Sequence, residues 1–243
     1  MHSRTLAIGD IHGGLKALLE VLDKAEVTER DHLIFLGDYV DGWSDSANLI
    51  SFLIELNATH NCLFLRGNHD ELLYNYLAKN HCPDKWLMHG GQQTVDAYKN
   101  LDKQTLSLHI NFLESLQNYH IDTQNRLFVH AGFSNLGGPE LEFYPNMVYW
   151  DRSLWELVAA MEPNLPKEDV RFPQRLKIFD EIYIGHTPTT RLGSTLPLNF
   201  YQVWNLDTGA AFKGSLTIMN INTKEYWQST PVYQLYPKEN GRN

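Results

Sequence analysis

Cysteine is scarce in this sequence, which holds only Cys62 and Cys82 among its 243 residues. The two form no Cys-x-x-Cys pair, which argues against a disulfide-rich scaffold and against a zinc ribbon. Long hydrophobic runs are also missing, since no apolar stretch approaches the ~20 residues that a membrane-spanning helix needs. We therefore expect a soluble cytoplasmic protein that does not act at a membrane.

Positive charge is scarce as well. The chain has 20 Lys and Arg residues against 29 Asp and Glu residues, a formal net charge of −9 and a pI near 5.6. Proteins that bind nucleic-acid polymers rely on clustered Lys and Arg, so such a polymer is not an expected partner. An acidic chain is compatible with a metal-centred enzyme, because bound cations make the site attractive to phosphate even when the whole protein is negative.

The first part of the chain alternates between predicted strands and helices. Apolar runs typical of buried strands each lead into a helical pattern of leucines, and the strands are expected at residues 5–10, 32–38 and 62–67. Alternation at a spacing of about thirty residues indicates an α/β fold with parallel strands. The length suits one large domain, so we predict a single domain over residues 1–243.

The rest of the chain is more varied. A helical cap is predicted over about 71–120, followed by buried strands at 126–130 and 181–184. Three later segments alternate like an antiparallel meander, at residues 201–206, 215–221 and 225–228. We expect a second sheet, stacked on the first, to hold them. Residues 238–243 are expected to be frayed.

Polar side chains follow the ends of the predicted buried strands, next to glycines that let the backbone turn. Those that carry potential ligand atoms are two carboxylates, one amide and three imidazoles: Asp10, Asp38, Asn68, His12, His130 and His186. This mixture suits Mn, Fe or Zn better than Ca or Mg, which prefer oxygen ligands. Of these side chains only a carboxylate can bridge two cations, and the centrally placed Asp38 is therefore the expected shared ligand. A pair of metals ~3.5–4 Å apart would activate a bridging water and bind phosphoryl oxygens.

Five motifs in order resemble those of the calcineurin-like metallophosphoesterases: Gly9-Asp10-Ile11-His12-Gly13, Gly37-Asp38-Tyr39-Val40-Asp41, Gly67-Asn68-His69-Asp70, His130-Ala131-Gly132 and Gly185-His186-Thr187. Within that superfamily the chain is similar to the phosphoprotein phosphatase branch, which includes bacterial serine/threonine phosphatases and symmetrical diadenosine tetraphosphatases. The resemblance implies two stacked mixed β-sheets flanked by helices.

The resemblance also implies a role for each motif residue. Asp10, His12 and Asp38 would hold one metal, and the other would be held by four residues: Asp38, Asn68, His130 and His186. His69 would be the general acid that protonates the leaving oxygen, and Asp41 would orient its imidazole. This pairing is physically reasonable, because a carboxylate partner raises the proton affinity of a histidine and fixes its tautomer.

The sequence departs from the family pattern directly after Asp41, where Gly42-Trp43 stands in place of Arg-Gly. One phosphate-binding guanidinium is therefore missing, and Trp43 could instead stack on an aromatic group or a nucleobase. Arg66 and Arg152 match arginines of bacterial members, and we predict that both bind substrate phosphate. Each could alternatively pair with a neighbouring carboxylate.

The leading hypothesis is a dinuclear metal-dependent phosphatase. It would hydrolyse phosphomonoesters, including phosphoserine or phosphothreonine in proteins, by attack of a metal-bridging hydroxide, with Mn as the first choice of metal and Fe or Zn as alternatives. The alternative hypothesis is a symmetrical hydrolase of dinucleoside polyphosphates, and a third is a non-catalytic binding module. The sequence leaves open the substrate, the oligomeric state, whether Trp86 touches substrate or only packs, and whether Asp207 reaches the site.

Overall fold

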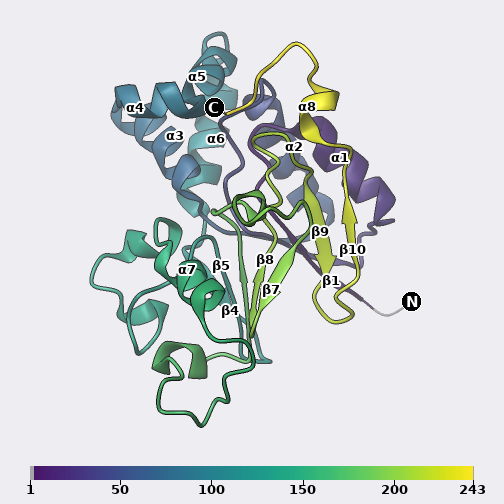
Figure 1. Cartoon of the computed structure of the whole chain (residues 1–243). Helices are drawn as coiled ribbons and strands as arrows, with labels where there is room; N and C mark the ends of the chain where they lie inside the picture. The colour runs from purple at the N-terminus through teal and green to yellow at the C-terminus, as the bar shows by residue number, and fades with distance from the viewer. Residues whose placement is uncertain (1–2, 243) are drawn as a thin grey trace.

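The computed structural model describes residues 3–242 and contains two five-stranded sheets (Figure 1). In the first sheet the strand order is β10-β9-β1-β2-β3, with β1, β2 and β3 parallel, β9 antiparallel to β1, and β10 antiparallel to β9. The strands are β1 (Thr5–Ile8), β2 (His32–Phe35), β3 (Asn61–Phe64), β9 (Thr217–Asn220) and β10 (Tyr226–Gln228). The carboxyl ends of the three parallel strands therefore lie at one edge.

The second sheet has the order β4-β5-β6-β8-β7, with β5, β6 and β8 parallel and an antiparallel strand at each edge. Its strands are β4 (Tyr119–Ile121), β5 (Arg126–Val129), β6 (Glu181–Ile184), β7 (Leu198–Phe200) and β8 (Val203–Asn205). The two stacked mixed sheets predicted from the sequence are thus confirmed.

Helices cover the outer faces of the sheets. The α-helices are α1 (Leu15–Lys24), α2 (Ser46–Thr59), α3 (Asn68–Lys79), α4 (Asp84–Trp86), α5 (Gln92–Tyr98), α6 (Lys103–Ser115), α7 (Ser153–Ala160) and α8 (Val232–Leu235). Shorter π- and 3₁₀-helical turns are η1 (Leu87–Gly91), η2 (Pro139–Leu141), η3 (Pro145–Tyr149), η4 (Gln174–Lys177) and η5 (Thr189–Leu192). Helices α3–α6 occupy the region of the predicted cap, while the predicted count of one domain stays a prediction.

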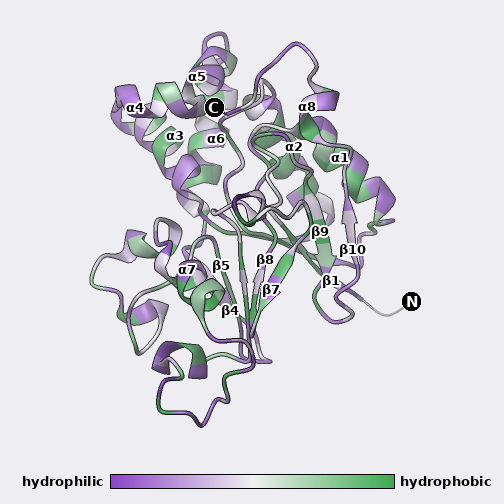
Figure 2. Cartoon of the chain, viewed as in Figure 1, coloured by the Kyte–Doolittle hydropathy of each residue, from purple (hydrophilic) through white to green (hydrophobic). Residues whose placement is uncertain are grey.

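Apolar side chains form three buried clusters that hold the two sheets and their helices together. A cluster between the sheets joins residues from both, including Ile34 and Met219 from the first sheet and Phe128 and Tyr183 from the second. The Phe128 and Tyr183 rings stack with their centroids 5.0 Å apart. A second cluster joins the first sheet to its helices, and a third joins the second sheet to α7. In Figure 2 helix α1 alternates between hydrophobic and hydrophilic residues, as expected of a helix with one buried face.

Two expectations about the later chain are wrong. The predicted antiparallel meander is divided between the sheets, since β8 pairs in parallel with β6 while β9 and β10 extend the first sheet beside β1. Residues 238–242 are also not frayed, because the Arg242 amide donates to the Ala211 carbonyl at 2.8 Å and the Glu239 amide donates to the Tyr236 carbonyl at 3.0 Å. Asn243, the last residue of that prediction, lies outside the described residues. Within residues 3–242, no helix has the length and apolar character that crossing a membrane requires.

Candidate active site

The predicted metal ligands converge where parallel strands of both sheets end. Asp10 and His12 follow β1, Asp38 follows β2, Asn68 begins α3 after β3, and the two remaining histidines follow β5 and β6. Two groups of three side chains have all their ligand atoms within 4.8 Å of one another: Asp10, His12 and Asp38, and Asp38, His130 and His186. All five are buried, and Asp38 belongs to both groups.

Backbone carbonyls fix the orientation of two of these histidines. His12 Nδ1 lies 3.0 Å from the carbonyl oxygens of Val40 and Asp41, and His130 Nδ1 lies 2.8 Å from the Leu36 carbonyl. Because a carbonyl can only accept, each Nδ1 carries a proton, and Nε2 is the nitrogen that can offer a lone pair to a metal once it carries no proton of its own. Both Nε2 atoms face Asp38 Oδ2, at 3.5 Å for His12 and 3.3 Å for His130. This is the arrangement of metal-binding imidazoles.

The remaining donors complete a mixed nitrogen and oxygen set. Asn68 Oδ1 lies 3.2 Å from His130 Nε2 and 2.9 Å from His186 Nδ1. His186 Nε2 is buried and has no hydrogen-bond partner among the described residues. An unpartnered buried nitrogen beside carboxylate and amide oxygens is accounted for by a divalent transition metal, so the residues present fit such an ion.

The charges at this site are strongly coupled. Burial opposes ionisation of Asp38, but the charges of His130 and His69 hold the pKa of its carboxyl well below the usual range. Burial, aided by the charge of Asp207, raises the pKa of Asp10 well above its usual range. Burial alone would lower the pKa of His130, yet the carboxylates of Asp38 and Asp10 raise it to about 10. The positive charge of protonated His130 therefore offsets the negative charge of the buried carboxylates. A divalent cation that displaces this proton can offset the same charge.

The predicted general acid and its partner lie together beside these ligands. His69 Nδ1 is 2.5 Å from Asp41 Oδ2, and the backbone amide of His69 donates to Asp38 Oδ1 at 2.9 Å. The indole Nε1 of Trp86 also donates to Asp41 Oδ2, at 2.5 Å, and the Asp41 amide donates to Thr94 Oγ1 at 3.0 Å. Trp86 therefore does more than pack: it holds the carboxylate that faces His69.

The backbone of the site is strained at four of the residues with predicted roles. His12, Asp38, Asp41 and His186 have φ angles of 54°, 54°, 72° and 68°. These values lie in the left-handed region, which non-glycine residues seldom adopt. Strain of this kind persists only where the surrounding structure holds it, and it gathers at functional sites.

Two motif glycines are explained by the carboxylates that lie against them. A Cβ on Gly67 would lie 2.1 Å from Asp38 Oδ1, and a Cβ on Gly185 would lie 1.9 Å from Asp10 Oδ1. Neither approach is possible for a residue with a side chain, so both carboxylates can occupy their positions only because these residues are glycine.

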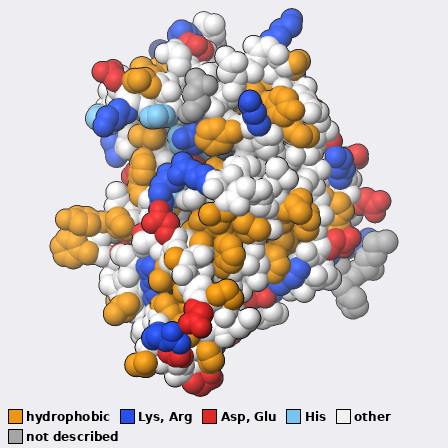
Figure 3. Space-filling model, viewed as in Figure 1, with side chains coloured by type: hydrophobic (Ala, Val, Ile, Leu, Met, Phe, Trp, Pro, Cys, Tyr) orange, Lys and Arg blue, Asp and Glu red, His pale blue; other side chains and the backbone are white. Residues whose placement is uncertain are grey.

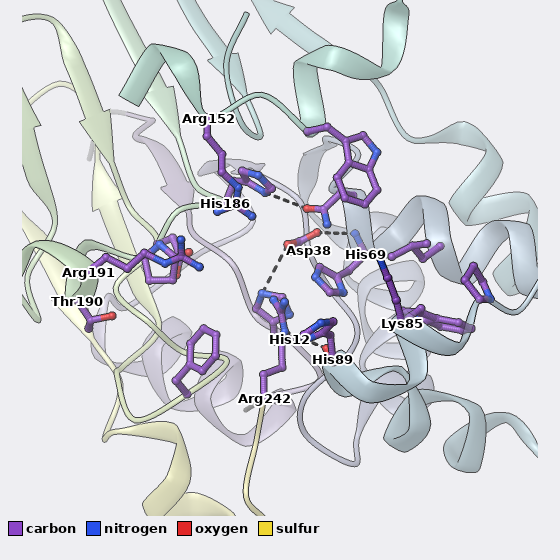
Figure 4. A pocket seen from close by; sticks show the side chains of 18 residues that line it. His12, Asp38, His69, Lys85, His89, Arg152, His186, Thr190, Arg191 and Arg242 are labelled. Carbon is purple, nitrogen blue, oxygen red and sulfur yellow. Dashed lines mark hydrogen bonds and ion pairs between the residues drawn. The ribbon is translucent and has the colours of Figure 1, made fainter. Parts of the chain in front are cut away.

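These side chains line a cavity of about 710 Å³. Its floor includes His12, Asp38, Asn68, His69 and His186, and its walls include apolar side chains from Leu72, Trp86, Trp150 and Phe212. Figure 3 shows Lys or Arg side chains close to histidine side chains in the upper left part of this face. Figure 4 shows Arg152, Arg191 and Arg242 around the histidines and Asp38.

Comparisons with known proteins identify the family. The sequence profile described as calcineurin-like phosphoesterase matches residues 3–190. The chain belongs to this family. As a calcineurin-like phosphoesterase it is a metal-dependent hydrolase, which confirms the family and the class of enzyme predicted from its motifs.

Curated relatives cover almost the whole chain. The bis(5'-nucleosyl)-tetraphosphatase PrpE (asymmetrical) of Oceanobacillus iheyensis is 25% identical, covering 90% of this chain and 89% of that protein. Serine/threonine-protein phosphatase 1 of Salmonella typhimurium is 26% identical, covering 88% of this chain and 90% of that protein. A serine/threonine phosphatase and a dinucleoside tetraphosphatase are thus both found among relatives of similar identity, and the named tetraphosphatase is asymmetrical, whereas the alternative weighed from the sequence is a symmetrical one.

Solved structures share the fold. The crystal structure of a putative diadenosine tetraphosphatase has a TM-score of 0.62 at 18% identity, covering 94% of this chain and 93% of that one. A cold-active protein-tyrosine phosphatase of a psychrophilic Shewanella has a TM-score of 0.57 at 14% identity, covering 95% of this chain and 81% of that one. At these identities the likeness establishes the metallophosphoesterase fold alone.

The two arginines predicted to bind substrate in this phosphoesterase lie in different places. Arg152 lines the cavity, and its Nη1 is buried without a partner among the described residues. Arg66 does not line the cavity; its Nη2 donates to the carbonyl oxygens of Glu114 and Leu116 at 3.2 and 3.3 Å. The structure therefore brings Arg152 to the other site residues but not Arg66.

Trp43 does not reach the cavity of this phosphoesterase. Its side chain is fully buried, its indole Nε1 donates to the Ala210 carbonyl at 2.8 Å, and its ring stacks on Tyr236 with centroids 5.4 Å apart. The expectation that Trp43 could stack on a substrate ring is therefore wrong, because its partners come from the far end of the sequence.

Two further residues of the site were not assigned from the sequence. The Asp70 carboxylate accepts hydrogen bonds of 2.8 Å from the backbone amides of Asp38, Tyr39 and Gly67, and so ties two ligand-bearing loops together. Burial and the charge of Asp38 raise the pKa of Asp70 to about 7. Asp207 is buried and lines the cavity, and it also accepts from the Gly209 amide at 3.0 Å. Turn formation and a place in the site, which the sequence left as alternatives, both apply to Asp207.

Proposed function

We propose that this chain is a dinuclear metal-dependent phosphoesterase that hydrolyses phosphomonoesters. One observation carries the proposal: two ligand groups share the buried Asp38, and His69 with its partner Asp41 lies beside them. A shared carboxylate suits two cations, and an imidazole held by a carboxylate suits proton transfer.

Asp10, His12 and Asp38 would hold one ion, and the second would be held by four residues: Asp38, Asn68, His130 and His186. When bound, the ions polarise phosphoryl oxygens and lower the pKa of a water to near neutrality. The mixture of imidazole nitrogens and carboxylate and amide oxygens favours Mn, with Fe or Zn as alternatives.

The chain's own residues supply binding and proton transfer. Arg152, half-buried with an unpartnered Nη1, would bind phosphoryl oxygens. His69 would carry a proton on Nε2 and pass it to the leaving oxygen, while Asp41 accepts from Nδ1 and stabilises the imidazolium. Substrate binding by Arg66 stays a prediction from the sequence, as does a cytoplasmic location.

A second candidate is hydrolysis of dinucleoside polyphosphates. The relative from Oceanobacillus supports it by name, and so does a cavity with arginines and aromatic side chains on its walls. The same residues would act on a phosphoanhydride bond. Symmetrical cleavage of diadenosine tetraphosphate would release ADP alone, whereas asymmetrical cleavage would release ATP and AMP.

A substrate panel on the metal-stripped chain tests both candidates. The chain is resupplied in turn with Mn, Fe, Co, Ni or Zn and assayed on p-nitrophenyl phosphate, phosphopeptides and diadenosine tetraphosphate, with products separated by chromatography. Turnover that depends on added metal supports the proposal. No turnover of any substrate with any of these metals would overturn it.

A further inference from the structure

The backbone around Arg242 is fixed in the cavity wall. Its amide donates to the Ala211 carbonyl at 2.8 Å, and its side-chain Nε donates to the His89 carbonyl at 3.0 Å. The preceding Gly241 is buried so closely that a Cβ there would lie 2.8 Å from the Trp43 ring. Residues 241 and 242 are therefore held by hydrogen bonds to Ala211 and His89 and by contact with Trp43.

Two glycines make room for the stem of this arginine. A Cβ on Gly90 would lie 2.8 Å from Arg242 Cγ, and a Cβ on Gly42 would lie 3.3 Å from the same atom. The guanidinium carbon lies 5.5 Å from the centroid of the Phe212 ring. The side chain therefore passes between two glycines, and Figure 4 shows it directed toward His12. The terminal nitrogens Nη1 and Nη2 form no hydrogen bond with any described residue.

Arg242 shares the cavity with two other guanidinium groups. Arg152, Arg191 and Arg242 all line it, and none forms an ion pair with a carboxylate of residues 3–242. Burial and the charges of Arg191 and Arg242 lower the pKa of Arg152. Like charges that repel one another around a cavity are stabilised by an anion between them.

The cavity is larger than one phosphoryl group requires. A volume of about 710 Å³ is that of a site for a whole small molecule. Arg152 lies beside His186 (Figure 4) and is therefore placed to bind a phosphoryl group at the predicted metal ligands. Arg191, which is exposed on η5, and Arg242 on another wall are then available for further negative charge.

We propose that Arg191 and Arg242 bind phosphate groups beyond the reacting one, so that the enzyme prefers oligophosphate chains to simple phosphomonoesters. The inference rests on the proposed phosphoesterase function and, of its two candidate substrate classes, favours the phosphoanhydrides over the phosphomonoesters. The bidentate geometry of guanidinium groups suits consecutive phosphates, and the apolar walls suit the organic group that ends such a chain.

Steady-state kinetics of Arg242→Gln and Arg191→Gln test the proposal in the full, Mn-loaded chain. A hydrogen bond to a charged group contributes about 1.5–3 kcal/mol, which corresponds to a factor of about 10–100. We expect each variant to lose about that much more kcat/KM on diadenosine tetraphosphate than on p-nitrophenyl phosphate, mainly through KM. Lys238→Gln is the matched control, because Lys238 is an exposed cation of the same segment that does not line the cavity.

Calorimetric titration separates this inference from the function on which it rests. Wild-type chain should bind inorganic tripolyphosphate more tightly than orthophosphate, and each variant should lose most of that difference, whether or not any substrate turns over. Equal losses for both phosphates, or no loss in either variant, would overturn the inference while leaving phosphoesterase activity intact. Thermal unfolding of each variant verifies that it is folded.

Discussion

The floor and the walls of the cavity are built in opposite ways. The floor consists of buried side chains at the ends of β1, β2, β3, β5 and β6, cross-linked by short hydrogen bonds and strained backbone. The walls carry half-buried or exposed arginines on turns and on the last described segment, and the terminal nitrogens of Arg242 form no hydrogen bond with any described residue. Rigid placement suits the proposed metal ligands and the proposed proton donor, whereas guanidinium nitrogens without a partner suit the proposed recognition of a substrate.

Removing the shared carboxylate should have the largest effect. Asp38→Asn keeps the size of the side chain but removes the charge that both ligand groups share. Two-metal catalysis is worth several kcal/mol, so we expect kcat to fall by about 10³-fold or more and both ions to be lost. Elemental analysis of the dialysed protein measures the metal content, with the exposed Asp23→Asn as the control. An Asp38→Asn protein that still holds two ions would contradict the shared role.

Removing the predicted acid should be milder and should leave the predicted metal ligands in place. His69→Ala takes away the imidazole that faces Asp41 but none of the predicted ligands. We expect the rate to fall by about 10²–10⁴-fold, as is typical for general acids, with both metals retained. Substrates with better leaving groups should lose less, because their leaving oxygen needs less protonation. If His69→Ala lost its metals, the side chain would be a ligand and the assignment of its role would be wrong.

The floor could be predicted from the sequence because its signals are local. A glycine, a carboxylate or an imidazole after a buried strand indicates both the strand end and a candidate ligand, as for Asp10, His130 and His186. Strand alternation does not specify which sheet edge a hairpin joins, so the pairing of β9 with β1 could not be predicted.

The walls depend on contacts between distant segments. Nothing near Arg242 in the sequence indicates that it returns to Gly42 and Gly90, and Trp43 is buried by Tyr236 from the far end of the chain. Arg66 illustrates the reverse case. It stands at a position where the family has an arginine, yet its guanidinium meets carbonyl groups at the end of α6.

Substitutions of Arg152 and Arg66 compare a predicted substrate-binding arginine that lines the cavity with one that does not. Arg152→Gln should raise the KM for p-nitrophenyl phosphate by about 10–100-fold, the worth of a hydrogen bond to a charged group. Arg66→Gln, which removes bonds to two carbonyl groups outside the cavity, should change KM less than threefold. Steady-state kinetics on both variants give the comparison. Equal increases in KM would mean that Arg66 also reaches the substrate.

A substitution at the opposite end of the first sheet should change the activity least. It therefore gives a baseline for the effects of substitutions in the floor and in the walls of the cavity. Just before β2, Asp31 accepts from Arg4 Nε at 3.0 Å and Nη2 at 2.8 Å, and from the Thr28 amide at 2.9 Å. Burial opposes ionisation, but the Arg4 guanidinium lowers the pKa of Asp31 to about 2. A folded pKa below the unfolded value means that this carboxylate stabilises the fold above about pH 4 and that the contribution disappears as the pH falls toward 2.

Asp31→Asn should therefore lower the free energy of unfolding by about 1–2 kcal/mol at pH 7, since Arg4 is partly exposed and solvent weakens the pair. Urea denaturation of both proteins measures the difference, which should stay constant between pH 5 and pH 8 and shrink below pH 4. Activity at pH 7 should stay within about twofold, because surface changes away from a site rarely alter it. A large loss of activity would mean that β1 and β2 transmit strain from Asp31 to Asp10 and Asp38 at their other ends. The geometry of the cavity floor would then depend on the whole sheet and not only on the floor's own hydrogen bonds.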